Sequence, residues 1–286
     1  SQHIGAPCNP LVKKGDRVTL GQKIGDNEGL CVPVHASVSG TVKAVEMRPH
    51  SSGTMMMSVV IENDHQDTLC PDIQPRTPEV VEKLSPAELM SIIREAGIVG
   101  MGGASFPAHV KLNPPKDKKI DYVLVNAAEC EPYLTCDERT MAETPDRLID
   151  GLSIILHISG ALGIIALEDN KSYLKPVLES EIQKQNLSGK IAVCVVKTKY
   201  PQGSEKFIVA SCLGIEIPSA KLPADAGCII SNVGTVCAVS DAFRLGKPLI
   251  ERALTISGGA VEKPCNLRVP VGTLISDLTP SAFTLK

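Results

Sequence analysis

Aromatic residues are scarce in this sequence, which has no Trp, four Tyr and four Phe among its 286 residues. Sites for single-stranded nucleic acid stack bases on aromatic side chains, so this scarcity argues against such a site. The 29 Lys and Arg are scattered along a chain whose net charge is −3. No concentrated basic stripe is visible, and we expect no nucleic-acid partner.

Paired cysteines are also missing, because none of the ten Cys forms a C-x-x-C motif. This excludes the ligand patterns of zinc ribbons, thioredoxins and ferredoxins. The wide spacing, without a secretory leader, favours reduced thiols in a cytosolic compartment. We expect most of the cysteines to be small buried apolar residues and predict no metal site. Cys130 and Cys136, spaced C-x5-C, could bind a metal only with outside partners.

The chain has one long uncharged run, residues 151–167, which reads GLSIILHISGALGIIAL. A membrane-spanning helix needs about 20 apolar residues, and His157, Gly160 and Gly163 interrupt this shorter run. We therefore expect a buried helix that ends near Gly160, followed by a strand from Gly163.

Two changes of sequence texture divide the chain into three predicted domains. Residues 1–72 hold short alternating segments with Gly turns, which predict a small β sandwich or barrel. Residues 80–245 alternate strand-like and helix-like segments, which predicts an α/β fold around a Rossmann-like, largely parallel sheet. Ser85 and Pro86 mark the start of one of its helices, and Gly97 marks the end. Residues 246–286 return to short β segments and favour a small β-grasp module.

The layout of residues 1–72 resembles the barrel-sandwich hybrid fold of lipoyl and biotinyl carriers. Those carriers attach their cofactor to a Lys at a hairpin tip, whereas the corresponding tip here reads HASVSG. The resemblance therefore implies a structural β module that carries no cofactor of its own.

A glycine-rich loop, residues 100–112, reads GMGGASFPAHVKL. It fails the dinucleotide fingerprint, because Ser105 stands at the third glycine position and a predicted helix precedes the loop. It also fails the Walker A pattern, because no Lys follows the glycines directly. The backbone N–H groups of such a loop can still surround an anion, with Lys111 as a counter-charge. Phosphate binding and a simple turn both remain open for these residues alone.

Three further segments leave predicted strands and lead towards helices. They read NAAECEPYLTCDER (126–139), KYPQGSEKFIV (199–209) and ISNVGT (230–235). Parallel sheets bind ligands at the carboxyl ends of their strands, so these segments are expected to meet at one edge of the sheet. The four acids of the first segment could equally form a solvated loop.

Together these four segments resemble the RnfC family of Rnf electron-transport complexes, in which nearly the same motifs recur in the same order. They are also similar to the flavin- and NADH-binding subunit of respiratory complex I, whose flavin loop reads G-R-G-G-A-G-F-P. The resemblance spans essentially the whole chain. It implies a barrel-sandwich module, an α/β flavin domain and a β-grasp soluble-ligand-binding module, with FMN and NAD(H) as cofactors of an oxidoreductase subunit.

The resemblance implies these cofactor-binding residues: Gly100, Gly102, Gly103, Ala104, Lys111, Asn126, Glu129, Glu131, Tyr200, Gly203, Glu205, Asn232 and Thr235. It also implies that Phe106 lies with Glu131 near the nicotinamide, while the flavin itself carries the redox chemistry. Four positions depart from the complex I pattern. Met101 replaces an Arg, and Ala128, Ser204 and Gly234 replace acids, in a manner that RnfC proteins share.

The resemblance further implies other Rnf subunits and a ferredoxin-like electron carrier as partners. It implies a peripheral place on the cytoplasmic side of the cell inner membrane, held by those subunits. RnfC proteins carry 4Fe-4S ligands in a ferredoxin-like module that this sequence lacks, so we expect a piece of a longer protein.

Two other functions stay open. A structural or docking subunit would keep this architecture without flavin, as in a related component of the sodium-pumping NADH:quinone reductase. A regulatory module that binds a phosphate or a nucleotide would depend on the glycine loop alone.

Overall fold

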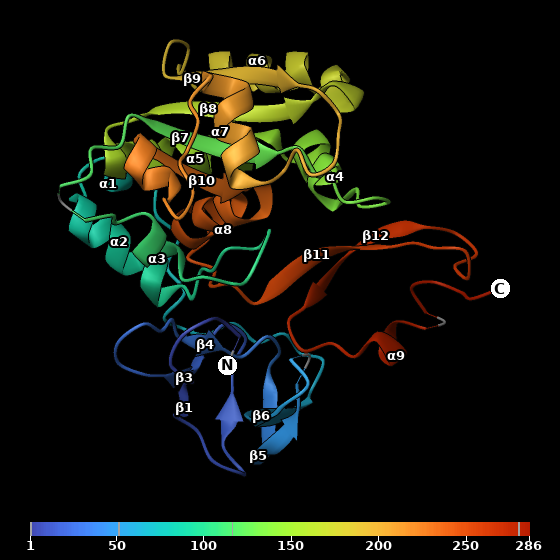
Figure 1. Ribbon diagram of the computed structural model, residues 1–286. Helices are drawn as coiled ribbons and strands as arrows, with labels where there is room; N and C mark the ends of the chain where they lie inside the picture. The colour runs from blue at the N-terminus through green and yellow to red at the C-terminus, as the bar shows by residue number, and fades with distance from the viewer. Residues whose placement is uncertain (1, 51, 116, 280) are drawn as a thin grey trace. The chain divides into compact units, whose positions relative to one another are not determined.

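The computed structural model of the protein describes residues 2–50, 52–115, 117–279 and 281–286 (Figure 1). The chain divides into two compact units. Unit 1 comprises residues 1–110, 241–251 and 270–272, and unit 2 comprises residues 111–240, 252–269 and 273–286. The predicted N-terminal β module lies in unit 1, apart from residues 1 and 51, which are outside the described residues.

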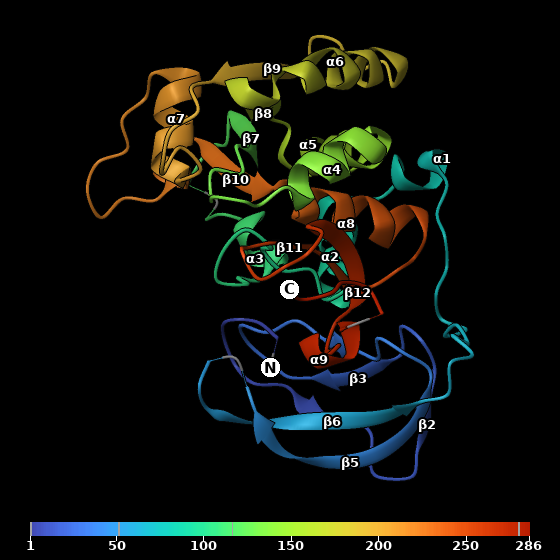
Figure 2. The ribbon, with the colours of Figure 1, turned by 90° about the vertical axis from the view of Figure 1, so that its right-hand side faces the viewer.

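Two small antiparallel sheets build the β module of unit 1. One contains β1 (Asn9–Pro10), β3 (Lys23–Asp26) and β4 (Val34–His35), and the other contains β2 (Arg17–Val18), β5 (Gly40–Pro49) and β6 (Met55–Asn63). Figure 2 shows β5 and β6 side by side in one layer, with β3 in the other. Buried Val18, Ile24, Ala36 and Val42 form its core. The predicted small β sandwich is confirmed.

The helical part of unit 1 follows from local signals. It begins with α1 (Pro78–Val81) and α2 (Pro86–Glu95). Ser85 caps α2, since its Oγ accepts the amide of Glu88 and the Glu88 carboxylate accepts the amide of Ser85 at 2.8 Å. Gly97 ends the turn with a φ of +70°, a conformation that glycine adopts without strain. Both predicted boundaries are confirmed.

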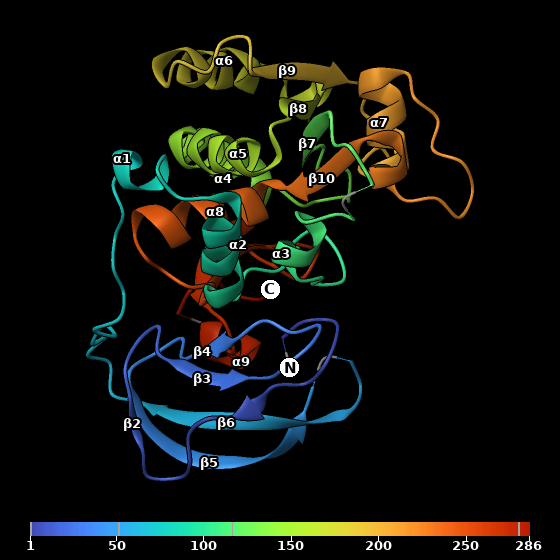
Figure 3. The ribbon, with the colours of Figure 1, turned by 90° about the vertical axis from the view of Figure 1, so that its left-hand side faces the viewer.

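Unit 2 is built around a four-stranded parallel sheet. Its strands are β7 (Tyr122–Ala127), β8 (Leu162–Glu168), β9 (Ile191–Val196) and β10 (Cys228–Asn232), in the order β10-β7-β8-β9. Figures 2 and 3 show α5 (Pro145–Ser159) and α6 (Lys175–Lys184) on one face, and α7 (Glu205–Leu213) on the other. The predicted α/β fold around a parallel sheet is confirmed.

The long uncharged run forms the end of α5 and most of β8. Gly160 terminates α5 with a φ of +69°, and β8 begins at Leu162. This is the predicted helix–strand pair. Among the described residues, no helix is long and apolar enough to cross a membrane.

The sequence NKSYLKPVLESEIQKQN, residues 170–186, predicts a helix after β8, and this prediction is only partly correct. Residues 170–174 lie in a 3₁₀ helix, η1 (Asp169–Leu174), and the α-helix α6 begins at Lys175. The interruption lies at Lys171, whose φ of −115° is not helical. This backbone turn accompanies burial of its side chain, whose ammonium donates to the Ala128 carbonyl at 3.1 Å.

The remaining elements connect the sheet and end the chain. They are α3 (Ala108–Lys111), α4 (Cys136–Glu143), η2 (Pro223–Ala226), α8 (Val233–Arg244), β11 (Glu251–Ile256), β12 (Cys265–Pro270) and α9 (Ile275–Leu278). Strands β11 and β12 form a two-stranded sheet. Assignment of this last region to a β-grasp module stays a prediction.

Candidate functional site

Two asparagines occupy the carboxyl edge of the parallel sheet in unit 2. Asn126 in β7 and Asn232 in β10 are direct register partners on neighbouring strands. From β7 the chain continues to β8 and β9 on one side, and β10 lies on the other side of β7. Strands β7 and β10 therefore flank the point where the strand order reverses. Open α/β sheets bind ligands outside this switch point. The structure thus brings together two of the residues singled out from the sequence.

The amide of Asn126 joins β7 to the segment before α7. Its Nδ2 donates to the carbonyl of Gly203 at 2.8 Å, and its Oδ1 accepts the amide of Ala128 at 3.3 Å. The Gly203 amide lies 3.2 Å from the Cys130 Sγ. A Cβ at Gly203 would come within 3.0 Å of that sulfur. Gly203 therefore packs closely against the side chains of Asn126 and Cys130.

Glu129 organises the start of α4. Its two carboxylate oxygens accept the amides of Asp137 and Glu138 at 2.8 and 3.1 Å. These amides lie in the first turn of α4, where no intrahelical acceptor exists. Glu129 also has a φ of +48°, an uncommon conformation for a residue other than glycine. Its side chain therefore supports the backbone of the site.

Asp137 is a site residue that was not predicted individually. It was one of the four acidic residues in segment 126–139, which could equally have formed a solvated loop. Its Oδ2 accepts a hydrogen bond from Nδ2 of Asn232 at 2.6 Å. Burial, followed by the nearby charge of Glu129, raises the pKa of Asp137 to about 6. The hydrogen bond from Asn232 and the charge of Arg252 offset part of this rise. A carboxyl group with this pKa can take up or release a proton near neutral pH.

We expect Asp137→Asn to flatten the pH dependence of stability. The pKa of Asp137 in the folded protein is raised to about 6. Its contribution to the free energy of unfolding is therefore complete below the unfolded pKa and is lost as the pH rises through 6. Relative to the variant, the unmodified protein should lose on the order of 2–3 kcal/mol of unfolding free energy between about pH 4 and 7.5. Urea unfolding across this range measures it. The exposed Asp67→Asn is the control, and parallel curves for the protein and Asp137→Asn would contradict the raised pKa.

A buried ion pair lies beside these residues, at the end of the neighbouring strand β8. Glu168 and Lys171 are 1% and 5% exposed, and their charged atoms are 3.5 Å apart. Burial raises the pKa of Glu168, and the charge of Lys171 counteracts this rise. Neither residue was predicted from the sequence. Glu168 carries a signal similar to that of Asn126, because both are polar residues at the carboxyl end of a parallel strand.

Two buried oxygens at this edge suit a ligand that donates hydrogen bonds. Among the described residues, Oε1 of Glu168 and Oε1 of Gln202 are buried without a hydrogen-bond partner. Gln202 is adjacent to Gly203, and Lys171 links Glu168 to Ala128. Buried acceptors are normally satisfied. The ribityl hydroxyls and the ring N–H of a flavin are donors of the required kind, so the residues present fit FMN.

The other predicted residues of unit 2 form two pairs and one buried position. Lys111 forms an ion pair with Glu205. The charge of Glu131, followed by a hydrogen bond to it, raises the pKa of the exposed Tyr200. Thr235 is 4% exposed in the first turn of α8.

Residues 100–110 of the glycine loop belong to unit 1, whereas Lys111 and Leu112 belong to unit 2. A backbone hydrogen bond of 2.8 Å from the amide of Gly100 to the carbonyl of Phe106 closes the loop. Within the described chain, no backbone hydrogen bond uses the amides of Gly102, Gly103 or Ala104, and all three residues are exposed. Free, exposed amides of this kind can bind an anion.

Two groups of side chains have the spacing of metal ligands within the described residues. One is Glu129, Cys136 and Asp137, and the other is His3, Cys8 and Cys31. In the first group the carboxylates already accept hydrogen bonds from the protein. We therefore assign no metal to it.

The prediction that most cysteines are buried is wrong. Four of the ten are buried, and six are half-buried. Small apolar packing therefore accounts for only part of the cysteine content.

Two protein families match the chain. The family model of the Nuo51 FMN-binding domain matches residues 93–241, about half of the chain. The model of the RnfC barrel sandwich hybrid domain matches residues 1–66. The second match confirms the barrel-sandwich hybrid fold expected for the N-terminal β module.

Several curated proteins are similar to nearly the whole chain. The C subunit of the Na+-translocating ferredoxin:NAD+ oxidoreductase complex of Acetobacterium woodii is 46% identical over 274 residues, which are 95% of this chain and 61% of that protein. The C subunit of the proton-translocating complex of Clostridium ljungdahlii is 45% identical over 278 residues, 96% and 60% of the two chains. The C subunit of the ion-translocating oxidoreductase complex of Rhodobacter capsulatus is 40% identical over 97% of this chain and 53% of that protein. The chain thus spans about three fifths or less of these relatives.

Among solved structures, an NAD+-reducing NiFe-hydrogenase in its H2-reduced state has a similar fold. The TM-score is 0.58 at 21% identity, over 69% of this chain and 39% of that chain. This likeness concerns the fold alone.

Proposed function

We propose that this chain, which belongs to the RnfC family of Rnf complexes, is the part of such a protein that binds FMN and exchanges electrons with NAD(H). The match to an FMN-binding domain supports this function over that of a docking subunit without flavin. The observation that carries the proposal is the pair Asn126 and Asn232, in register at the switch point of the sheet.

The proposed cofactor-binding residues are those that the family resemblance implies. When bound, FMN accepts a hydride and releases electrons singly, and the chain holds and orients it. The exposed amides of Gly102, Gly103 and Ala104 would bind its phosphate as an anion. Asn126 Oδ1 accepts one internal hydrogen bond and keeps a second lone pair for a donor on the ligand.

Proton handling would fall to Asp137. Its pKa of about 6 lets it hold a proton in mildly acidic solution and release it at neutral pH. The hydrogen bond to Asn232 keeps this carboxyl at the sheet edge. We propose Phe106 and Glu131 for the nicotinamide side, where both residues are exposed.

We further propose that the whole protein passes single electrons to 4Fe-4S clusters outside this chain and to a ferredoxin-like carrier. It would do so on the cytoplasmic side of the inner membrane, held peripherally by other Rnf subunits. The names of the relatives, ferredoxin:NAD+ oxidoreductase complexes, support these partners. The family matches over residues 1–66 and 93–241 support the proposed domains 1–72 and 80–245, with 246–286 as the β-grasp module.

Flavin retention tests the proposal directly. We expect the protein, incubated with FMN and desalted, to keep the visible flavin spectrum and to bleach on anaerobic addition of NADH. Riboflavin lacks the phosphate and should bind at least about tenfold more weakly, since one charge-assisted hydrogen bond contributes roughly 1.5–3 kcal/mol.

Controls make the result decisive. Heat-denatured protein treated in the same way measures unspecific flavin. If FMN is not retained, and neither FMN nor NADH raises the thermal unfolding midpoint, the docking function replaces the proposed one. Equal affinities for FMN and riboflavin would contradict a phosphate site.

A further inference from the structure

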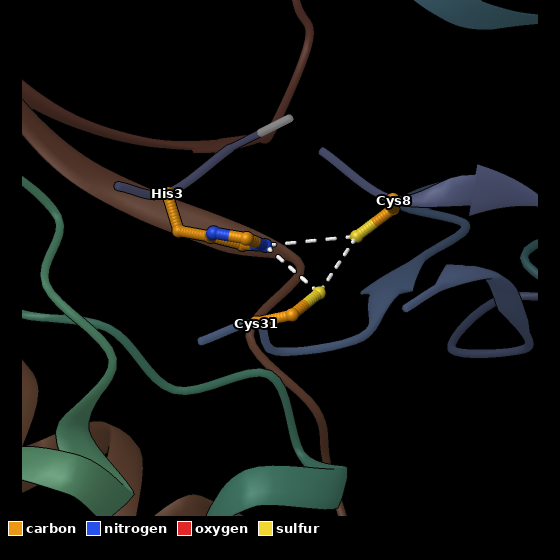
Figure 4. A group of neighbouring side chains, drawn as sticks. All are labelled: His3, Cys8 and Cys31. Atoms are coloured by element: carbon orange, nitrogen blue, oxygen red, sulfur yellow. Dashed lines mark hydrogen bonds between the residues drawn. The ribbon is translucent and has the colours of Figure 1, made fainter. Parts of the chain in front are cut away.

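Three side chains from separate segments of the β module in unit 1 meet at one point. His3 lies before β1, Cys8 immediately precedes it, and Cys31 lies between β3 and β4. Figure 4 shows the imidazole of His3 facing the sulfur atoms of both cysteines. Because residues 3, 8 and 31 match no local ligand motif, only the fold reveals the cluster.

The distances within the cluster are those of a metal site. Nε2 of His3 lies 3.6 Å from Sγ of Cys8 and 3.5 Å from Sγ of Cys31, and the two sulfurs are 3.5 Å apart. Around tetrahedral zinc, with bonds of about 2.3 Å to sulfur and 2.0–2.1 Å to nitrogen, ligand atoms are separated by about 3.5–3.8 Å. The three atoms therefore form one face of a tetrahedron of nearly the right size.

The histidine is held in the tautomer that binds metals. Nδ1 of His3 is 3.1 Å from the carbonyl oxygen of Ile4, which can only accept, so Nδ1 carries the proton. In the neutral ring, Nε2 then carries the lone pair, which faces the two sulfurs and also accepts the Val32 amide at 3.4 Å, a hydrogen bond that a metal would displace. A backbone carbonyl that orients a ligating imidazole through its other nitrogen is a common feature of metal sites.

The ligand set selects the type of metal. Two thiolates and an imidazole favour zinc over the oxygen-binding ions magnesium and calcium. Among the described residues, no fourth His, Cys, Asp or Glu joins the group. His3 and Cys8 are only half-buried, so solvent can reach the cluster.

We propose that His3, Cys8 and Cys31 bind one zinc ion, with water in the fourth position. Both thiols lie within 3.4 Å of the Val32 carbonyl, whose oxygen accepts a hydrogen bond from each thiol proton when no metal is bound. Zinc would replace these protons with two metal–sulfur bonds, and the protons would pass to solvent. The bound ion would join the N-terminal segment to the β3–β4 loop.

This site has a consequence for the glycine loop. The amide of Ile4, next to His3, donates to the carbonyl of Ser105 at 3.2 Å, and Ser105 follows the loop glycines. Zinc at His3 would therefore hold the segment that contacts the loop. This part of the inference rests on the proposed FMN function.

Metal content tests the site without reference to flavin. The tag-free chain, purified under reducing conditions, should contain one zinc per molecule by mass spectrometry. Cobalt substitution should produce a thiolate-to-cobalt charge-transfer band and intense visible bands typical of a tetrahedral site. Reduced, folded protein that takes up neither ion would overturn the proposal. So would a Cys8–Cys31 disulfide that persists in reductant while no metal binds.

Single variants identify the ligands. Cys8→Ser, Cys31→Ser and His3→Ala should each lower the zinc affinity by about 100-fold or more. In the cobalt-substituted protein, each cysteine variant should also halve the intensity of the thiolate-to-cobalt charge-transfer band. Cys212→Ser is the matched control, because this half-buried thiol contacts Cys194 and no histidine completes that pair among the described residues. If a cysteine variant does not fold, His3→Ala still decides, and unchanged affinity there would overturn the assignment.

Flavin titration of the zinc-loaded and zinc-free forms separates the two proposals. Weaker FMN binding after zinc removal, restored by zinc, supports the link to the loop. Equal FMN affinity in both forms would overturn that link. Zinc bound without any flavin affinity would leave the metal site standing and contradict the proposed function.

Discussion

Gly103→Val is expected to lower the affinity for FMN by about 100-fold or more while the protein stays folded. Gly103 is exposed in the glycine loop, and a Cβ built there meets no heavy atom within 4 Å. Its φ lies outside the left-handed region, so valine introduces no strain of that kind. The unfolding free energy should therefore change by less than about 1 kcal/mol.

The ligand is affected because an anion must approach the loop backbone closely. A phosphate oxygen accepts an N–H group at a nitrogen–oxygen distance of about 2.7–2.9 Å. The two methyl groups of valine occupy part of this space. Loss of two charge-assisted hydrogen bonds, at roughly 1.5 kcal/mol each or more, amounts to about 3 kcal/mol, which is the expected 100-fold.

Quenching of flavin fluorescence measures the affinity, and urea unfolding measures the stability. Gly259→Val is the matched control, because a Cβ at this glycine also has open space around it. It should leave both quantities unchanged. If Gly103→Val binds FMN as tightly as Gly259→Val does, the phosphate site lies elsewhere.

Sequence patterns predicted the parallel sheet and its binding edge, because both follow from local signals. Alternation of strand and helix segments implies parallel strands, and a polar residue at the end of a buried strand lies at the carboxyl edge. The pairing of Asn126 with Asn232 could not be predicted in this way. It depends on β10 lying beside β7 and not beside β9, and strand order is decided by tertiary packing.

Helix boundaries, too, were predictable only where local hydrogen bonds determine them. The start of α2 at Ser85 and the end of α5 at Gly160 were predictable, because their hydrogen bonds span a few residues. The start of α4 was not. Thr135, its N-cap residue, makes no side-chain cap, and Glu129 satisfies the first-turn amides from six residues before it. No sequence rule distinguishes such an acid from a solvated one.

The zinc ligands were also beyond sequence reasoning, for a similar reason. Known ligand motifs place at least two ligands within a few residues on one turn. His3, Cys8 and Cys31 instead converge because β3 and β4 return the chain to its N-terminal segment. Composition indicated ten thiols, and only the tertiary structure shows that two of them face an imidazole.

Gly151→Ala is expected to destabilise the protein by about 3 kcal/mol or more. Gly151 lies within α5, where a Cβ would come within 2.0 Å of the Val236 carbonyl oxygen and 3.2 Å of the Ser240 amide nitrogen. Both atoms belong to the backbone of α8, so no side-chain rotation relieves the overlap. Helix α8 has to move by more than 1 Å to reach an ordinary contact distance of about 3.4 Å or more.

The sign of the change in stability shows whether Gly151 is an ordinary exposed helix glycine or a close contact between the backbones of α5 and α8. In an exposed helix, alanine in place of glycine stabilises by about 1 kcal/mol, because glycine loses more backbone entropy on folding. Here the overlap exceeds that gain. A shift of α8 also breaks the 2.6 Å hydrogen bond from Ser240 to Asp150. The loss is a large fraction of a typical stability of about 5–15 kcal/mol.

Urea unfolding of Gly151→Ala, with Gly259→Ala as the control in open space, measures the difference. Helix α8 begins directly after Asn232 and carries Thr235 in its first turn. A displaced α8 therefore moves one of the paired asparagines away from Asn126, and FMN affinity should fall together with stability. A stabilised Gly151→Ala protein would mean that α5 and α8 do not touch backbone to backbone, and the geometry of the sheet edge would lose this support.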